Sequence, residues 1–172
     1  YSPSSRTALA EAELEYPDGH TSPSVYAAFD VVESPVLDEF LPAKLAVWTT
    51  TPWTLPANLA VAVGDDLEYA VADVNGTKLV VARALVEAVS AKMGCEEATV
   101  LATFKGSELA GTTYARPIAN GMGATGSVVV GGDYITSEGG TGLVHTAPGH
   151  GADDYATGLK YGLEPFSPVD AA

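Results

Sequence analysis

Two short segments of the chain carry residue types that could bind a small ligand. The first lies between Trp48 and Asn58 and contains two prolines and four threonines: Thr49, Thr50, Thr51 and Thr54. Because proline excludes an ordinary helix or a central strand, the hydroxyls and amides of this loop must be satisfied by local bonds, water or a ligand. Neutral donors of this kind suit ribose hydroxyls and a phosphate, although an ordinary threonine–proline turn has the same composition.

The second segment, residues 139–155, has the pattern of a strand, a glycine-rich turn and the start of a helix. Asp153 and Asp154 fall in the first turn of that helix. The helix dipole stabilises an ionised carboxylate there, so either residue could bind a ligand ammonium. The alternative is that both acids only cap the helix.

Other chemistry is less well supported by the residues. His145, His150 and Asp154 could be read as metal ligands, which keeps a metal-dependent hydrolase open, but their spacing matches no recognised metal signature. The chain has no G-x-S-x-G motif, and Cys95 is followed by the acids Glu96 and Glu97, which do not activate a thiol as nucleophile, so protein-based nucleophilic catalysis is disfavoured. Residues 121–126 satisfy G-x-G-x-x-G, but a strand pattern follows them, which predicts a loop and not a phosphate-binding turn.

Composition and charge exclude several classes of protein. The 172 residues include 8 Lys and Arg against 22 Asp and Glu, giving a net charge of −14, which excludes a nonspecific nucleic-acid binder but not a local contact. No run approaches the roughly 18 apolar residues that a membrane span needs, so we expect no membrane partner. The single Cys95 fits a reducing compartment. The length predicts one domain, residues 1–172, and the missing initial Met predicts that it is excised from a longer protein.

Apolar periodicity predicts a β-rich α+β fold. Strands are expected at residues 9–16, 25–32, 45–49, 60–63, 69–74, 79–82, 99–104, 127–130 and 142–146. Asn75 and Gly76 predict a tight hairpin turn within residues 69–82. Helices are expected at residues 84–93, followed by Gly94, and at residues 153–161, followed by Gly162.

Together, these segments resemble a known family. Residues 48–58 and 140–155 resemble the threonine-rich peptide and the histidine–aspartate segment of the editing domain inserted into isoleucyl-tRNA synthetase. Residues 2–16, 22–24 and 160–163 also resemble that domain, so the likeness covers nearly the whole chain. Thr51 is specific within the group, because valyl and leucyl relatives typically carry Arg at that position. The resemblance implies a β-barrel core with peripheral helices.

The resemblance also implies a role for each site residue. Asp154 would hold the substrate α-ammonium, and His145 would lie near the amino-acid side chain and help to set pocket size. Thr49, Thr50 and Thr51 would bond the terminal adenosine and the ester region. Trp53 and Thr54 would shape the pocket, and Asn58 would support the loop. The catalytic set would be Thr49, Thr50 and Asp154, with a positioned water as nucleophile and no metal.

The implied activity is hydrolysis of valine misattached to tRNA(Ile), and of valyl-adenylate. The implied partners are the 3′-terminal aminoacyl-adenosine of that tRNA, valine, and the remainder of the synthetase, with the domain itself a monomer. No cofactor is expected in this domain, because ATP and Mg would serve the parent catalytic domain. The compartment would be the cytoplasm, or the organelle stroma or matrix. The acidic charge predicts weak activity in isolation. A non-catalytic module that binds an aminoacyl or nucleotide ligand remains the main alternative.

Overall fold

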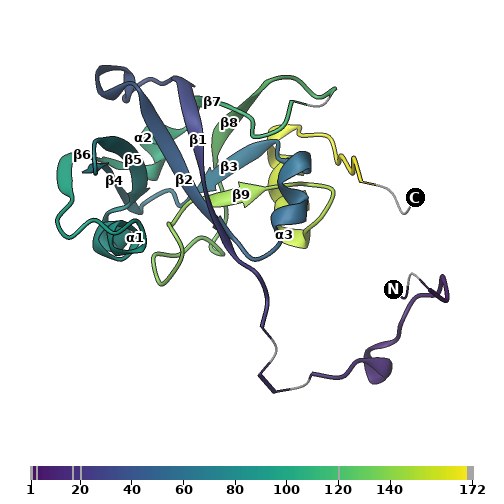
Figure 1. Ribbon diagram of the computed structural model, residues 1–172. Helices are drawn as coiled ribbons and strands as arrows, with labels where there is room; N and C mark the ends of the chain where they lie inside the picture. The colour runs from purple at the N-terminus through teal and green to yellow at the C-terminus, as the bar shows by residue number, and fades with distance from the viewer. Residues whose placement is uncertain (1, 3, 17, 20, 120, 170–172) are drawn as a thin grey trace.

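A nine-stranded mixed sheet forms the body of the molecule (Figure 1). The computed structural model describes residues 1–172 except 1, 3, 17, 20, 120 and 170–172. The strands lie in the order β6-β4-β5-β2-β1-β7-β8-β3-β9. Their bounds are β1 Val25–Glu33, β2 Ala43–Thr49, β3 Ala60–Val63, β4 Glu68–Val74, β5 Thr77–Ala82, β6 Thr99–Lys105, β7 Thr113–Ala115, β8 Thr125–Val130 and β9 Val144–Thr146.

Among the described residues, three helices and three 3-10 turns lie at the periphery of the sheet, and a fourth 3-10 turn, η1, lies on the amino-terminal segment away from it. They are α1 Val86–Lys92, α2 Gly106–Leu109, α3 Ala152–Tyr161, η1 Glu11–Glu13, η2 Asp38–Phe40, η3 Pro52–Ala57 and η4 Arg83–Leu85. In the described part of the chain, no helix has the length and apolar character to cross a membrane.

The β4–β5 hairpin forms as the sequence predicts. Asn75 and Gly76 have φ angles of 54° and 81°, the left-handed conformation that a two-residue turn between twisted strands requires. The Asp73 carboxylate accepts the Gly76 amide at 2.7 Å and fixes the turn. Most side chains of both strands are buried in the main core, so this hairpin anchors one half of the sheet.

The predicted β-rich α+β class is confirmed, but the predicted closed barrel is not observed. Among the described residues, β6 pairs with β4 only and β9 pairs with β3 only, so the two ends of the sheet remain unjoined. Closure requires a continuous register between the end strands. The three residues of β9 offer few backbone groups for such a register.

The strand predicted at residues 9–16 is wrong. Residues 4–16 are exposed, and η1 occupies part of the segment, with the Glu13 carboxylate accepting the Ala10 amide at 2.7 Å. Without a neighbouring strand or core, the alternating apolar residues there have nothing to pack against.

The helix predicted at residues 84–93 divides into η4 and α1. The sequence did not predict β7 and α2, because elements of three or four residues give too little periodicity.

Candidate functional site

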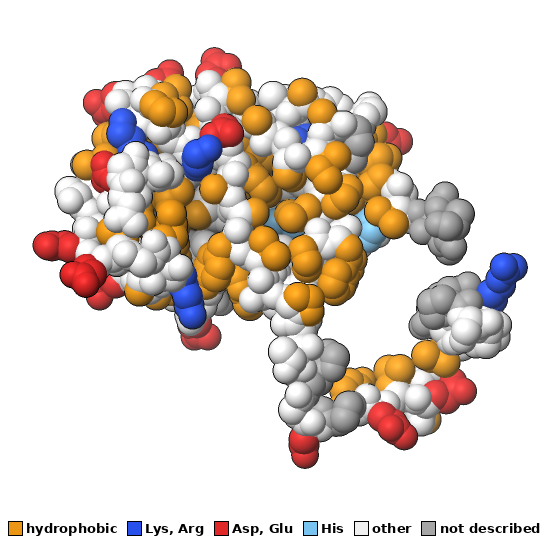
Figure 2. Space-filling model, viewed as in Figure 1, with side chains coloured by type: hydrophobic (Ala, Val, Ile, Leu, Met, Phe, Trp, Pro, Cys, Tyr) orange, Lys and Arg blue, Asp and Glu red, His pale blue; other side chains and the backbone are white. Residues whose placement is uncertain are grey.

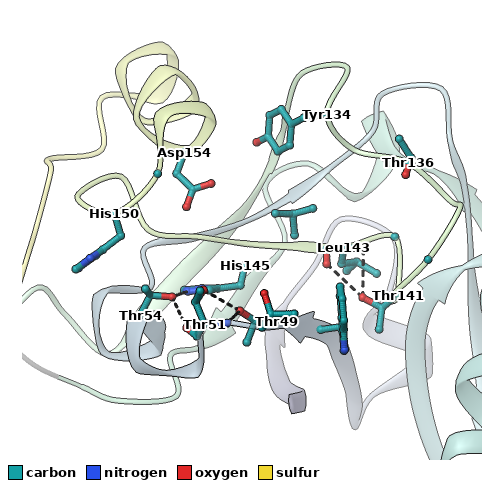
Figure 3. A pocket seen from close by; sticks show the side chains of 17 residues that line it. Thr49, Thr51, Thr54, Tyr134, Thr136, Thr141, Leu143, His145, His150 and Asp154 are labelled. Carbon is teal, nitrogen blue, oxygen red and sulfur yellow. Dashed lines mark hydrogen bonds between the residues drawn. The ribbon is translucent and has the colours of Figure 1, made fainter. Parts of the chain in front are cut away.

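A cavity of about 400 Å³ opens beside the end of β2 (Figure 3). Three segments that are distant in the sequence line it: residues 48–54, residues 134–145 and residues 150–154. Its lining residues are Trp48, Thr49, Thr50, Thr51, Thr54, Tyr134, Thr136, Gly139, Gly140, Thr141, Gly142, Leu143, Val144, His145, His150, Gly151 and Asp154. Six of the eight site residues expected from the sequence are therefore brought together.

One wall is the threonine loop, defined here as residues 49–54. Thr49 ends β2, and its hydroxyl accepts the backbone amide of Thr51 at 3.0 Å. Proline at the first position of η3 fits a helix start, where its missing N–H is not needed. The Thr54 amide and hydroxyl both donate to the carbonyl of Thr51, at 3.0 and 2.9 Å. The loop is thus held by its own hydroxyls, and Thr50 and Thr51 remain exposed at the cavity.

His145, on β9, contacts the threonine loop although it lies 91 positions after Thr54 in the chain. Its Nε2 lies 3.0 Å from the Thr54 hydroxyl, and its Nδ1 lies 2.8 Å from the Asn58 side-chain amide nitrogen. Burial lowers the pKa of His145 from 6.5 to about 4, partly opposed by a hydrogen bond with Thr54. The imidazole is therefore neutral at physiological pH, and both ring nitrogens have protein partners.

Asn58 and Trp53, two residues expected at the site, do not line the cavity. The Asn58 side chain is fully buried behind the threonine loop and bonds to Tyr114 and His145. Trp53 points outward and is 59% exposed. Thr54 is the residue of η3 that lines the cavity, because a 3-10 turn directs successive side chains to different sides.

Asp154 faces the threonine loop from the opposite wall (Figure 3). One of its carboxylate oxygens accepts the Ala147 amide at 2.9 Å, which fixes the turn before α3. Burial raises the pKa of Asp154, an effect opposed by that hydrogen bond, so burial works against the helix dipole expected to keep the group ionised. Asp153 instead lines a separate groove with Lys160. Of the two acids at the start of α3, only Asp154 lines the cavity.

A metal-ligand set is not evident in the residues that the structure describes. No group of three or more His, Cys, Asp or Glu side chains is placed to hold an ion there. His145 uses both ring nitrogens on the protein, while His150 is exposed at the cavity. In Figure 2 the histidine side chains lie among apolar and uncharged ones, and acidic side chains gather toward the edges of that face.

Several lining residues were not expected from the sequence. Tyr134 bonds to Thr157 of α3 at 3.0 Å and separates the cavity from the groove beside Asp153. Thr136 and the glycine wall, residues 139–143, complete the lining. The glycines were recognised as a turn, but no sequence signal placed Tyr134 near the site, because its position depends on where β8 ends.

Comparison with known proteins gives the chain close relatives. Models of known protein families give no match. The chain is 57% identical over 175 residues to the isoleucine–tRNA ligase of a Synechococcus strain. It is 53% identical over 199 residues to the chloroplastic/mitochondrial isoleucine–tRNA ligase of Arabidopsis thaliana. Each alignment includes 99% of this chain. The chain is homologous to a segment of isoleucine–tRNA ligases. It spans 18% of the length of each of these two relatives.

Solved structures of synthetase domains share the fold of this chain. GlLeuRS-CP1 has a TM-score of 0.64 and 19% identity, with 86% of this chain and 70% of that chain covered. The P. knowlesi cytosolic leucyl-tRNA synthetase editing domain has a TM-score of 0.64 and 14% identity, with 83% and 64% covered. At these identities the likeness establishes the fold, and this chain has the fold of a synthetase editing domain.

Proposed function

We propose that this chain hydrolyses the ester between valine and tRNA(Ile), and the misactivated valyl-adenylate, as the editing domain of an isoleucine–tRNA ligase. The observation that carries the proposal is that Asp154 and the threonine loop line opposite sides of one cavity. An aminoacyl ester offers an ammonium at one end and a ribose at the other. The cavity presents a carboxylate and hydroxyl groups in a corresponding arrangement.

A separate hydrolytic site compensates for the limited selectivity with which a synthetase can bind isoleucine in preference to valine. One methylene distinguishes isoleucine from valine, and in the pocket where the amino acid is activated it contributes only about 1–3 kcal/mol of discrimination. A cavity that admits valine and excludes isoleucine by size removes the wrong product after it forms.

Asp154 is proposed to bind the substrate α-ammonium. One carboxylate oxygen is held by the Ala147 amide, and the group lines the cavity, so it can accept a charge-assisted bond from a ligand. The partly buried surroundings weaken screening by solvent.

The threonine loop is proposed to orient the ribose, the ester and a water molecule. The oxygen of that water adds to the ester carbonyl carbon, and the resulting tetrahedral intermediate collapses with cleavage of the bond to the ribose oxygen. The proton lost by the water ends on that ribose oxygen, and the products are valine and uncharged tRNA. His145 is a poor general base, because its pKa is about 4 and both ring nitrogens are engaged. The reaction therefore depends mainly on positioning, with help from the neighbouring ribose hydroxyl.

The rest of the synthetase is proposed as the source of tRNA affinity. A chain with a net charge of −14 gains little from phosphate contacts. ATP and Mg would serve the parent catalytic domain only. The named relatives suggest a bacterial cytoplasm or an organelle stroma or matrix as the compartment.

The test compares tRNA(Ile) charged with valine and the same tRNA charged with isoleucine, each mixed with excess chain in single turnover, with and without EDTA. We expect loss of the valyl ester, survival of the isoleucyl ester, and no effect of EDTA. Equal loss of both esters contradicts selection by size. Loss of activity in EDTA would favour a metal-dependent hydrolase, and binding without turnover would favour a non-catalytic module.

A further inference from the structure

Asn58 is the centre of a buried hydrogen-bond network behind the threonine loop. Its side-chain oxygen accepts the Tyr114 hydroxyl at 2.6 Å. Its side-chain nitrogen lies 2.9 Å from the Ala60 carbonyl and 2.8 Å from Nδ1 of His145. Both Asn58 and Tyr114 are fully buried, so water does not compete for these bonds.

Two anchors orient the Asn58 amide. The Tyr114 hydroxyl is a donor to its oxygen, and the Ala60 carbonyl is an acceptor from its nitrogen. Reversing the amide would place oxygen against the Ala60 carbonyl and NH₂ against the donating hydroxyl of Tyr114. Burial raises the pKa of Tyr114, so its hydroxyl keeps the proton that this arrangement needs.

The orientation of Asn58 decides which nitrogen of His145 carries hydrogen. Because the amide NH₂ points at Nδ1, that nitrogen must act as acceptor, and the neutral ring carries its hydrogen on Nε2. Nε2 then donates to the Thr54 hydroxyl.

We propose that Tyr114, which does not line the cavity, is a positioning residue for it: by orienting the amide of Asn58, it fixes the tautomer of His145. The Thr54 hydroxyl, which accepts from that ring, is left to donate to the carbonyl of Thr51. The conformation of the threonine loop thus depends on a hydroxyl contributed by β7.

Gly126 supplies the space that the Tyr114 hydroxyl occupies. A Cβ added at Gly126 would overlap the hydroxyl oxygen of Tyr114. The last glycine of the G-x-G-x-x-G run therefore has a packing role. Arg116 is a second link between this glycine run and Asn58. Its Nε donates to the backbone carbonyl of Asn58 at 2.6 Å, and its Nη1 donates to the backbone carbonyl of Gly123 at 2.9 Å.

The direct test is the ring nitrogen NMR spectrum of His145 at pH 7 in the whole 172-residue chain. We expect Nε2 to carry hydrogen in the wild type and the two tautomers to mix in Tyr114→Phe, which removes one hydroxyl. Val71→Ala, a change in the buried part of β4, is the control for lost stability and should leave the tautomer unchanged. A wild-type ring with hydrogen on Nδ1, or a single Nε2–H tautomer retained in Tyr114→Phe, overturns the inference.

Gly126→Ala provides a second variant that keeps the tyrosine but displaces its hydroxyl. It should also mix the tautomers, and an unchanged ring spectrum in a folded Gly126→Ala chain contradicts the mechanism.

The expected effect on hydrolysis rests on the proposed function, and it is measured in an assay separate from the NMR spectrum. In Tyr114→Phe we expect kcat to fall about tenfold with little change in KM, because misplacement affects the reacting geometry more than binding. Mixed tautomers with an unchanged kcat would overturn the positioning role. If the wild type shows the expected tautomer but hydrolyses no ester, the proposed function fails while the network stands.

Discussion

Replacing Asp154 with asparagine tests the central contact of the proposed reaction. The substitution removes the negative charge but keeps a side-chain oxygen that can accept the Ala147 amide, now held at 2.9 Å. The turn before α3 should therefore persist, and thermal unfolding should show little change. What is lost is the charge that would bind the substrate ammonium.

The expected magnitude follows from the surroundings of Asp154. A hydrogen bond to a charged group contributes about 1.5–3 kcal/mol, and each 1.4 kcal/mol corresponds to about a tenfold change. Asp154 is only partly exposed and lines the cavity, so solvent does not cancel the interaction. We expect kcat/KM for valyl-tRNA hydrolysis to fall roughly 10- to 150-fold.

Asp153→Asn is the matched control. It makes the same chemical change one residue away, in a side chain that lines the neighbouring groove. The rate of single-turnover hydrolysis of valyl-tRNA should change less than about twofold in this variant, because solvent and salt screen the exposed Asp153 carboxylate from a substrate in the cavity. The reasoning is refuted if Asp154→Asn retains wild-type kcat/KM, or if both substitutions reduce it equally.

Two further predictions concern stability. The pKa of His145 is about 4 in the folded chain, against an ordinary value of 6.5. Between these two pH values the unfolded chain binds more protons than the folded chain. The free energy of unfolding should therefore fall as the pH drops from about 6.5 to 4, by on the order of 3 kcal/mol. Urea unfolding across this range should show a shallower decline in His145→Gln, and identical pH profiles would disprove the assignment. Gly142→Ala should cost about 3 kcal/mol, because φ is +76° and the new Cβ would overlap that of Ala82. Gly139→Ala, which meets no atom within 4 Å, should unfold almost like the wild type, and an equal loss in both variants would exclude this cause.

Local patterns predicted much of the sheet, and their failures have identifiable causes. β3 begins and ends where the sequence indicates, and Asn75-Gly76 forms the expected turn, because both depend on neighbouring residues. The pattern at residues 9–16 is similar to that of a strand, but no sheet lies beside it. Alternation predicts which side chains could be buried, whereas the presence of a partner strand depends on distant parts of the chain.

The sequence by itself determined the two segments that carry the site, the loop conformation enforced by proline, and the position of Asp154 at a helix start. Only the tertiary structure decided which polar groups meet. It turned Asn58 away from the cavity and toward Tyr114, 56 positions later, brought His145 against Thr54, and added Tyr134 to the lining. The reason is physical: turns and caps are governed by nearby backbone geometry, but burial, the pKa of His145 and the direction of a hydrogen bond depend on atoms that folding brings together.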